Sequence, residues 1–218
     1  MRGKLNGNVL TRNKGGEVIR NKVTPINPRT SAQMLQRAYT SNIAKAWAGT
    51  LTDAQRQSWK SYGQTIGAKS IFGNNLILSG IATFQRINRI VLNSGGTLLT
   101  TAPIGQDVPS ILSLALTASV GPSTLSIAFD PSPLTGTQGI YLFACPPVSA
   151  GISNVSSSLR FVKFFSAPTS PLNILTAWEA VFGSFPTAAG QRIAVTAQVV
   201  DSATGAISAA TGASTLVV

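Results

Sequence analysis

The stretch TPINPRTSAQMLQR, which runs from Thr24 to Arg37, separates two parts of the chain with different character. Pro25 and Pro28 each fix their own φ angle, and each disfavours helical geometry in the residue before it. Thr30 follows as a helix N-cap, with Gln33 at the spacing of a capping box. The stretch therefore predicts a stiff, extended junction that ends where a helix begins. We expect it to hold an N-terminal arm (residues 1–29) off the rest of the protein at a fixed angle.

Positive charge is confined to the first part of the chain. Residues 1–90 hold 14 Lys and Arg side chains against two acidic ones, whereas residues 91–218 hold three against four. The net charges are therefore +12 and −1, within a total of +11. This asymmetry indicates two regions with different functions, and it favours contact of the first with an acidic partner, either nucleic acid or an acidic protein surface. The alternative is a solvated face that only keeps the chain soluble.

The residue types that carry catalysis and metal binding are scarce. The chain has no histidine, one cysteine and six acidic residues. It therefore lacks the material for a Ser-His-Asp or Cys-His arrangement and for a zinc site. We expect no enzymatic activity, no metal and no cofactor, and we expect Cys145 to be a small buried side chain at the end of a strand. The first residues lack the apolar segment of a signal peptide, and no stretch has the pattern of a membrane span, so a soluble intracellular product is expected.

Residues 3–22 predict a β-hairpin. The β-prone runs Asn8–Thr11 and Glu17–Arg20 flank Gly15 and Gly16, and glycine supplies the positive φ angle that a tight hairpin turn requires. The hairpin has too few apolar residues to bury a core, and an isolated two-stranded hairpin is only marginally stable in water. We therefore expect it to become ordered against a neighbour, either the helices of this chain or another subunit.

Three helices are predicted after the junction. The first runs from about Ser31 to Ala48, and a second capping box, Thr52 with Gln55, begins the next. The third spans roughly Asn75 to Asn93, with Asn88 on its apolar stripe, where we expect a hydrogen bond between helices. The aromatic residues are expected to pack between the helices rather than to stack on bases. The side chains predicted to form these apolar stripes are Leu35, Tyr39, Ile43, Trp47, Trp59, Tyr62, Ile66, Ile77, Ile81, Phe84 and Val91.

From Ser110 onward, apolar residues alternate with small polar ones, which is the period of a β-strand. About seven short strands in roughly 110 residues, separated by turns at Gly and Pro, are typical of a β-sandwich. Residues 172–182 fit either a helical turn or a strand. Few charges guard the strand edges, which favours their coverage in an assembly. The sequence thus predicts an arm over residues 1–29, a three-helix region over 30–94, a linker over 95–109 and an all-β sandwich over 110–218.

Two resemblances bear on this organisation. The runs Thr124–Phe129, Gly139–Phe143 and Arg192–Asp201 resemble strands of a fibronectin type III or related immunoglobulin-like sandwich, which implies that topology for the second half of an α+β chain. Residues 3–92 are similar to a loose group of structural and uncharacterised proteins of tailed bacteriophages and prophages, which implies a virion component. The features that carry this second resemblance are Gly7-Asn8, Arg12, Gly16, Val18, Arg20, Pro25, Asn27-Pro28-Arg29-Thr30, Ala32-Gln33, Arg37, Leu51-Thr52, Gln55-Arg56 and Trp59.

The sequence therefore favours a non-enzymatic structural protein of a phage particle, made in the host cytoplasm and located in the virion. We expect it to be a homo-oligomer without membrane contact, whose arm docks on an acidic surface of another virion protein in the shell, a decoration, a connector or the tail. The alternative is a DNA-binding protein that uses the basic helical region, and a carbohydrate-binding adhesin is a third possibility. The residues predicted to bind the partner are Arg12, Arg20, Pro25, Asn27, Pro28, Arg29 and Arg37.

Overall fold

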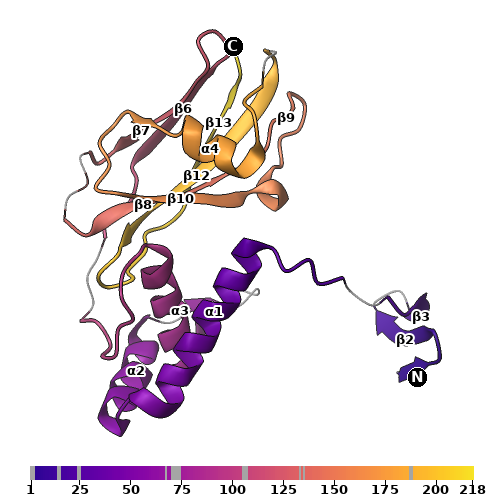
Figure 1. Cartoon of the computed structure of the whole chain (residues 1–218), viewed down its shortest axis with the longest axis vertical. Helices are drawn as coiled ribbons and strands as arrows, with labels where there is room; N and C mark the ends of the chain where they lie inside the picture. Colours follow the sequence, from indigo (N-terminus) through magenta and orange to yellow (C-terminus); the bar gives the residue numbers. More distant parts are fainter. Residues whose placement is uncertain are drawn as a thin grey trace. The chain divides into compact units, whose positions relative to one another are not determined.

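The computed structural model describes residues 3–13, 16–23, 26–66, 68–69, 75–104, 108–132, 134, 136–186 and 189–218 (Figure 1). The chain divides into two compact units, an N-terminal unit (Met1–Ala38) and a C-terminal unit (Tyr39–Val218). The predicted α+β fold class is confirmed, because the longer helices precede a separate sandwich of strands in the sequence. The finer division into residues 1–29, 30–94, 95–109 and 110–218 stays a prediction.

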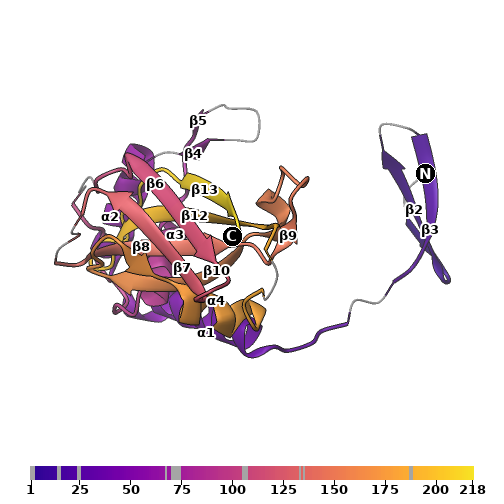
Figure 2. The same ribbon diagram turned by 90° about the horizontal axis from the view of Figure 1, so that it is seen from above.

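The N-terminal unit contains a three-stranded antiparallel sheet in the order β1-β2-β3. Its strands are β1 (Gly3–Leu5), β2 (Asn8–Asn13) and β3 (Gly16–Asn21), and β2 and β3 lie side by side in Figure 2. The pairing of these two strands confirms the predicted hairpin, although Lys14 and Gly15 of the turn lie outside the described residues. The sequence did not predict β1, since a strand this short has no periodicity of its own.

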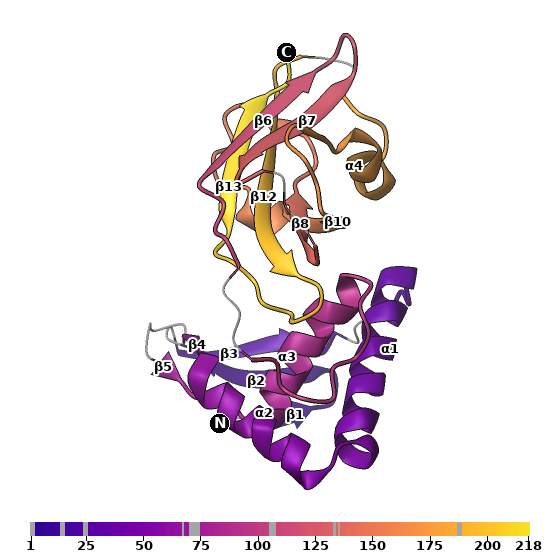
Figure 3. The same ribbon diagram turned by 90° about the vertical axis from the view of Figure 1, so that its left-hand side faces the viewer.

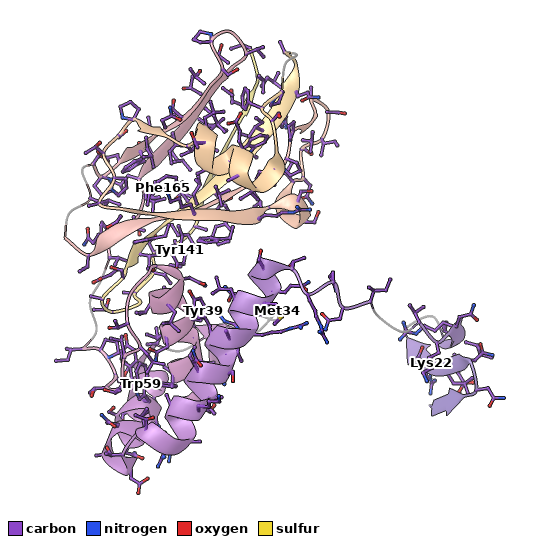
Figure 4. All side chains as sticks on the ribbon, in the orientation of Figure 1. Lys22, Met34, Tyr39, Trp59, Tyr141 and Phe165 are labelled. Carbon is purple, nitrogen blue, oxygen red and sulfur yellow. The ribbon has the colours of Figure 1, made fainter. Side chains whose placement is uncertain are left out.

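None of the side chains that the structure describes before Tyr39 is buried. Ile19 is 67% exposed, and Ile26 is 91% exposed. Leu35, which was predicted to face the helical core, is also exposed in the first turns of α1 (Ser31–Lys45). Figure 4 shows the side chains of the hairpin, with Lys22 labelled at its end. The arm therefore lacks the buried apolar area that stabilises an independent domain.

The first part of the C-terminal unit is a small helical core. It is built by the second half of α1, the π-helical turn η1 (Ala46–Thr50), α2 (Asp53–Ile66) and α3 (Gly80–Asn93). Trp59 is fully buried, and its ring packs edge-to-face on Phe84 with 5.2 Å between the centroids (Figure 4). The prediction that the aromatic residues form a core is confirmed for these two. The buried members of this core are Ile43, Leu51, Trp59, Phe84, Ile87 and Val91.

Capping side chains set the starts of the second and third helices. Thr52 and Gln55 exchange two hydrogen bonds, of 2.9 Å and 3.3 Å, which is the predicted capping box. The predicted start of the third helix near Asn75 is wrong, because Ser79 is the N-cap and its Oγ accepts from the backbone N–H of Ala82 at 3.3 Å. Asn75 instead belongs to β5 (Asn75–Leu76), which pairs with β4 (Ala68–Lys69) (Figures 2 and 3). Ile77, predicted for the apolar stripe, is exposed.

The first helix was predicted to end at about Ala48. The α-helix ends at Lys45, and the chain stays helical to Thr50 as the π turn η1, which the sequence did not predict. Arg56 stabilises this turn, because its Nε and Nη2 donate to the carbonyls of Trp47 and Ala48, each at 3.0 Å. Its Nη1 pairs with Asp53 at 2.7 Å. The guanidinium of Arg56 therefore has a structural role inside the helical core region.

Asn88 is fully buried on α3, and its amide joins the helix to the segment that follows. Its Nδ2 donates to the carbonyls of Phe84 at 3.1 Å and Leu99 at 3.2 Å, and its Oδ1 accepts from the N–H of Leu99 at 2.6 Å. The predicted hydrogen bond between helices is therefore wrong, because the partner is a non-helical segment. A buried amide in this place fixes the path of the chain as it leaves α3.

We expect Asn88→Leu to lower the free energy of unfolding by about 2–4 kcal/mol. The change removes the side-chain partner of both backbone groups of the half-buried Leu99, at about 1–3 kcal/mol for each group left unsatisfied. Equilibrium unfolding in urea measures the loss, and Asn42→Leu on the exposed face of α1 is the control, with an expected change within about 0.5 kcal/mol. Equal effects of the two substitutions would contradict the assigned role.

The remainder of the C-terminal unit is a β-sandwich (Figure 3). One sheet has the order β10-β8-β12-β13 with β9 beside β12, and the other has the order β11-β7-β6. Apart from the short β9, the sandwich has seven strands. The first, second and fifth of these in the sequence (β6, β7 and β11) form one sheet, and β8, β10, β12 and β13 form the other. This is an immunoglobulin-like arrangement with β10 beside β8. The strands are β6 (Ser113–Ser119), β7 (Thr124–Asp130), β8 (Gln138–Ala144), β9 (Val148–Ser149), β10 (Arg160–Ser166), β11 (Leu172–Asn173), β12 (Gln191–Asp201) and β13 (Thr211–Leu216).

Residues 172–182, which fitted either a strand or a helix, form both: β11 and then α4 (Leu175–Phe182). Trp178 of α4 is fully buried in the sandwich core, and its indole N–H donates to the carbonyl of Cys145 at 3.1 Å. The helix lies against β7 and β10, one strand from each sheet.

The C-terminal residue lies beside the edge of β6. The backbone of Val218 forms hydrogen bonds with the backbone of Val120 at 2.7 Å and of Ala118 at 3.2 Å. The C-terminal residue therefore covers part of the β6 edge, which charged side chains do not protect.

Tyr141 of β8 joins the sandwich to α3, whose end lies beside the loop after β12 (Figures 1 and 3). Its hydroxyl donates to the carbonyl of Ile90 and lies 3.0 Å from Oγ of Ser94. Burial raises the pKa of Tyr141 to about 12, and the hydrogen bond to Ser94 opposes this shift. The neutral phenol is thus part of the contact between the two cores of this unit.

Stability is expected to fall as the pH rises from about 10 to about 12. An unfolded tyrosine loses its proton near pH 10, so the folded protein binds more protons in this interval and its free energy of unfolding decreases, by about 2 kcal/mol for Tyr141. Urea unfolding at pH 9, 10.5 and 12 measures the slope. Tyr141→Phe should make the slope shallower, with a remainder from Tyr62, whose pKa is also raised by burial. An unchanged slope in the variant would contradict this account.

Candidate functional site

The structure places six of the seven predicted partner-binding residues, and Pro25 lies outside the described residues. Arg12 is on β2 and Arg20 on β3. Asn27, Pro28 and Arg29 form a segment without regular secondary structure before α1, and Arg37 is on that helix. All six are exposed, so the predicted cations are accessible to a partner.

Asn27 and Arg37 are brought together at the junction. Nη2 of Arg37 donates to Oδ1 of Asn27 at 2.9 Å, and the backbone N–H of Gln33 donates to Oγ1 of Thr30 at 3.3 Å. The segment before α1 is therefore joined to the first turns of the helix by a side-chain bond as well as by the helix cap. This bond uses one of the five donors of the guanidinium, so Arg37 retains donors for a second contact.

Arg29 adopts a left-handed backbone conformation, with φ at +49°. Residues with a Cβ enter this region at a cost of roughly 1 kcal/mol, and Arg has no short polar side chain to offset it locally. The conformation redirects the chain immediately before the Thr30 cap. The path of the chain between Asn27 and α1 is thus constrained by Arg29 together with the Asn27–Arg37 bond.

Arg12 and Arg20 lie on opposite faces of the arm sheet. In the register of β2 and β3, Arg12 lies opposite Glu17, and Arg20 lies opposite Val9. Because Glu17 and Arg20 are three residues apart on one strand, their side chains project to opposite faces. A single flat surface can therefore contact only one of the two arginines, whereas a partner that surrounds the arm can contact both.

The outer strand of the arm sheet is also available for pairing. β3 is bonded to β2 on one side, and no other strand lies beside it among the described residues. It contains no proline, and two of its own residues, Val18 and Ile19, are exposed and apolar. An edge of this kind accepts an added strand from another chain through main-chain hydrogen bonds.

A second basic site lies on the C-terminal unit, where sequence reasoning did not place one. A cavity of about 220 Å³ opens between α1 and α3. Nη2 of Arg89 donates to Oγ1 of Thr40 at 2.7 Å across it. We call it the basic cavity. Its lining residues are Thr40, Ile43, Ala82, Gln85, Arg86 and Arg89.

A more open groove of about 340 Å³ crosses β12 and β13, and every residue that lines it is uncharged. Four aromatic rings pack together on the adjacent strands β8 and β10: Tyr141, Phe143, Phe161 and Phe164. None of these rings is among the residues that line the groove, so a carbohydrate site stays a prediction. The lining residues are Ser153, Asn154, Val155, Ser156, Leu159, Ala194, Val195, Thr196, Gly212, Ala213 and Ser214.

Residue types that bind metals or act as nucleophiles are few among the described residues. No group of three or more His, Cys, Asp or Glu side chains among them could hold a metal ion. Cys145 is buried at the end of β8, as predicted, and burial raises the pKa of its thiol, which keeps it protonated and unreactive. In the part of the chain that the structure describes, no helix has the length and apolarity to cross a bilayer.

Comparisons with known proteins add no assignment. No protein-family model matches the chain, and no curated protein or solved structure matches it significantly.

Proposed function

We propose that this chain is a non-enzymatic structural component of a phage virion that docks through its basic arm. The observation that carries the proposal is an arm with positive charge and exposed apolar side chains but no buried side chain among those described. A segment of this kind gains stability when a partner buries it. The resemblance of residues 3–92 to phage structural proteins supports a virion as the place of assembly.

The composition of the arm favours an acidic protein surface as its partner. Ile19, Val23 and Ile26 are all more than half exposed and lie among the cations of the arm. Burial of such apolar side chains stabilises a protein–protein contact, whereas affinity for the phosphate backbone of nucleic acid comes mainly from positive charge. The β3 edge adds a means of pairing that requires a polypeptide partner.

Quantitative mass spectrometry of purified particles tests the proposal. We expect the chain to be present in a constant number of copies per particle across independent preparations, in proportion to the major shell protein. The chain should also remain bound after nuclease treatment, because its partner is a protein. Recovery of the chain only in the soluble fraction of the lysate would contradict the proposal.

The alternative function, DNA binding through the helical region, has one observation in its favour. The exposed cations Lys45, Lys60, Arg86 and Arg89 lie on α1, α2 and α3, and the one acid of these helices, Asp53, is paired with Arg56. Binding of the full chain to duplex DNA with a steep salt dependence would favour this function. The burial of Trp59 and Phe84 in the helical core removes them as stacking platforms for bases.

A further inference from the structure

We propose that the basic cavity between α1 and α3 binds the carboxylate of an acidic side chain from a partner protein. This would be a second docking site, separate in sequence from the arm. The inference rests on the proposed function for the identity of the assembly, because the acidic side chain is assigned to another virion protein. Its geometry rests on the C-terminal unit alone.

The charge in the cavity is not balanced by the protein. Arg86 and Arg89 lie one turn apart on α3, about 4.5 Å along the helix axis, and like charges at this spacing destabilise a helix. The sequences of α1 (Ser31–Lys45) and α3 (Gly80–Asn93) contain no acidic residue. Within the described residues, neither arginine forms an ion pair, and the side chain of Arg89 donates to the Thr40 hydroxyl. A bound anion would remove this repulsion.

The remaining lining residues select the kind of anion. Thr40 and Gln85 add neutral hydrogen-bonding groups beside the guanidinium groups, which bind planar carboxylates through two parallel bonds. Ile43 is buried and Ala82 is half-buried, so part of the wall is apolar. An Asp or Glu side chain satisfies both features, because its methylene stem contacts the apolar wall while its carboxylate meets the arginines.

A phosphate ligand fits this cavity less well. Free phosphate has no apolar part to cover Ile43 and Ala82. The phosphates of duplex DNA lie on a convex backbone of regular spacing, which meets a flat or grooved basic surface better than a recess of about 220 Å³ between two helices. The chemistry of the lining therefore favours a protein side chain.

Nitrogen-15 NMR of the full chain tests the inference, with the Nε–H signals of Arg86 and Arg89 as site-specific probes. The ligands are a blocked tetraglutamate peptide, inorganic phosphate and a 12-base-pair DNA duplex. We expect the peptide to shift both arginine signals in a saturable manner. The double variant Arg86→Gln/Arg89→Gln should bind the peptide at least about tenfold more weakly at this site, since a charge-assisted pair contributes about that factor or more.

Lys45→Gln/Lys60→Gln is the matched control, because it removes the same charge from exposed positions on α1 and α2 that do not line the cavity. Its affinity should stay within about twofold of the wild type. The single variant Arg86→Gln keeps the Arg89–Thr40 bond and should still weaken binding, which separates ligand binding from helix packing. Equal losses in cavity and control variants, or no shift with peptide, would overturn the proposal. Stronger cavity-dependent binding of phosphate or DNA would also overturn it.

These outcomes are distinct from those of the proposed function. Failure of the cavity leaves the chain in purified particles but without selective peptide binding at Arg86 and Arg89. Failure of the proposed function leaves the chain outside particles, whatever the peptide does.

Discussion

Replacing Arg12, Arg20 and Arg29 with Glu is expected to reduce the number of copies per particle at least about tenfold. The substitutions reverse three charges on an arm whose partner is acidic, and like charges brought together at an interface cost several kcal/mol. Because the three side chains are exposed, the isolated chain should keep its fold and its melting temperature. Quantitative mass spectrometry of purified particles, normalised to the major shell protein, measures the effect.

The matched control uses the three cations of the sandwich. Arg160→Glu/Lys163→Glu/Arg192→Glu produces the same change in net charge but leaves the arm intact. We expect this variant to enter particles at a level within about twofold of the wild type, because it alters only the weakly charged half. Similar losses in the two triple variants would show that net charge alone governs assembly, and the arm would lose its assigned role.

The second large effect concerns stability. Trp59→Ala is expected to lower the free energy of unfolding by about 3–5 kcal/mol, the range for removal of a buried aromatic side chain. Trp59 is fully buried, packs on Phe84, and donates its indole N–H to the carbonyl of Thr100 at 2.9 Å. The substitution leaves both a cavity and an unpaired carbonyl. Urea unfolding followed by far-UV circular dichroism measures the loss.

Ile19→Ala provides the contrasting substitution in the arm. Ile19 is 67% exposed, so its truncation should change the stability of the isolated chain by no more than about 0.5 kcal/mol. Its effect should instead appear as weaker incorporation into particles, because the partner buries this side chain. A large loss of stability in the isolated chain would mean that the arm already has a core.

Much of the fold follows from local sequence patterns. Glycines between short β-prone runs predicted the arm hairpin, and the Thr52–Gln55 box predicted the start of α2, because both signals act within a few residues. The period-two alternation after Ser110 predicted the sandwich for the same reason. The predicted start of α3 was too early. Ile77 continues the apolar pattern of the helix toward the N-terminus, but the helix begins only after its N-cap, Ser79. The π turn was not predicted, since the hydrogen bonds that stabilise it come from Arg56 of the next helix, which donates to the carbonyls of Trp47 and Ala48.

The candidate site was less accessible to sequence reasoning. Charge alone identified Arg12, Arg20, Arg29 and Arg37, but only the strand register shows that Arg12 and Arg20 face opposite sides. The Asn27–Arg37 bond depends on the conformation of the junction, which residue types do not specify. The basic cavity was missed because a helical pattern shows that Arg86 and Arg89 share a face, yet it does not show that α1 lies opposite them. The absence of acids from both helices is the signal that could have indicated it.

Hydrogen–deuterium exchange of the arm amides tests the central claim most directly, because the claim is that a partner buries the arm. In the isolated chain we expect the amides of β2 and β3 to exchange rapidly, since no buried core supports their hydrogen bonds. In purified particles the same amides should exchange at least about tenfold more slowly, while those of α3 and β12 change little. Equal exchange rates of β2 and β3 in the free chain and in the particle would contradict the account.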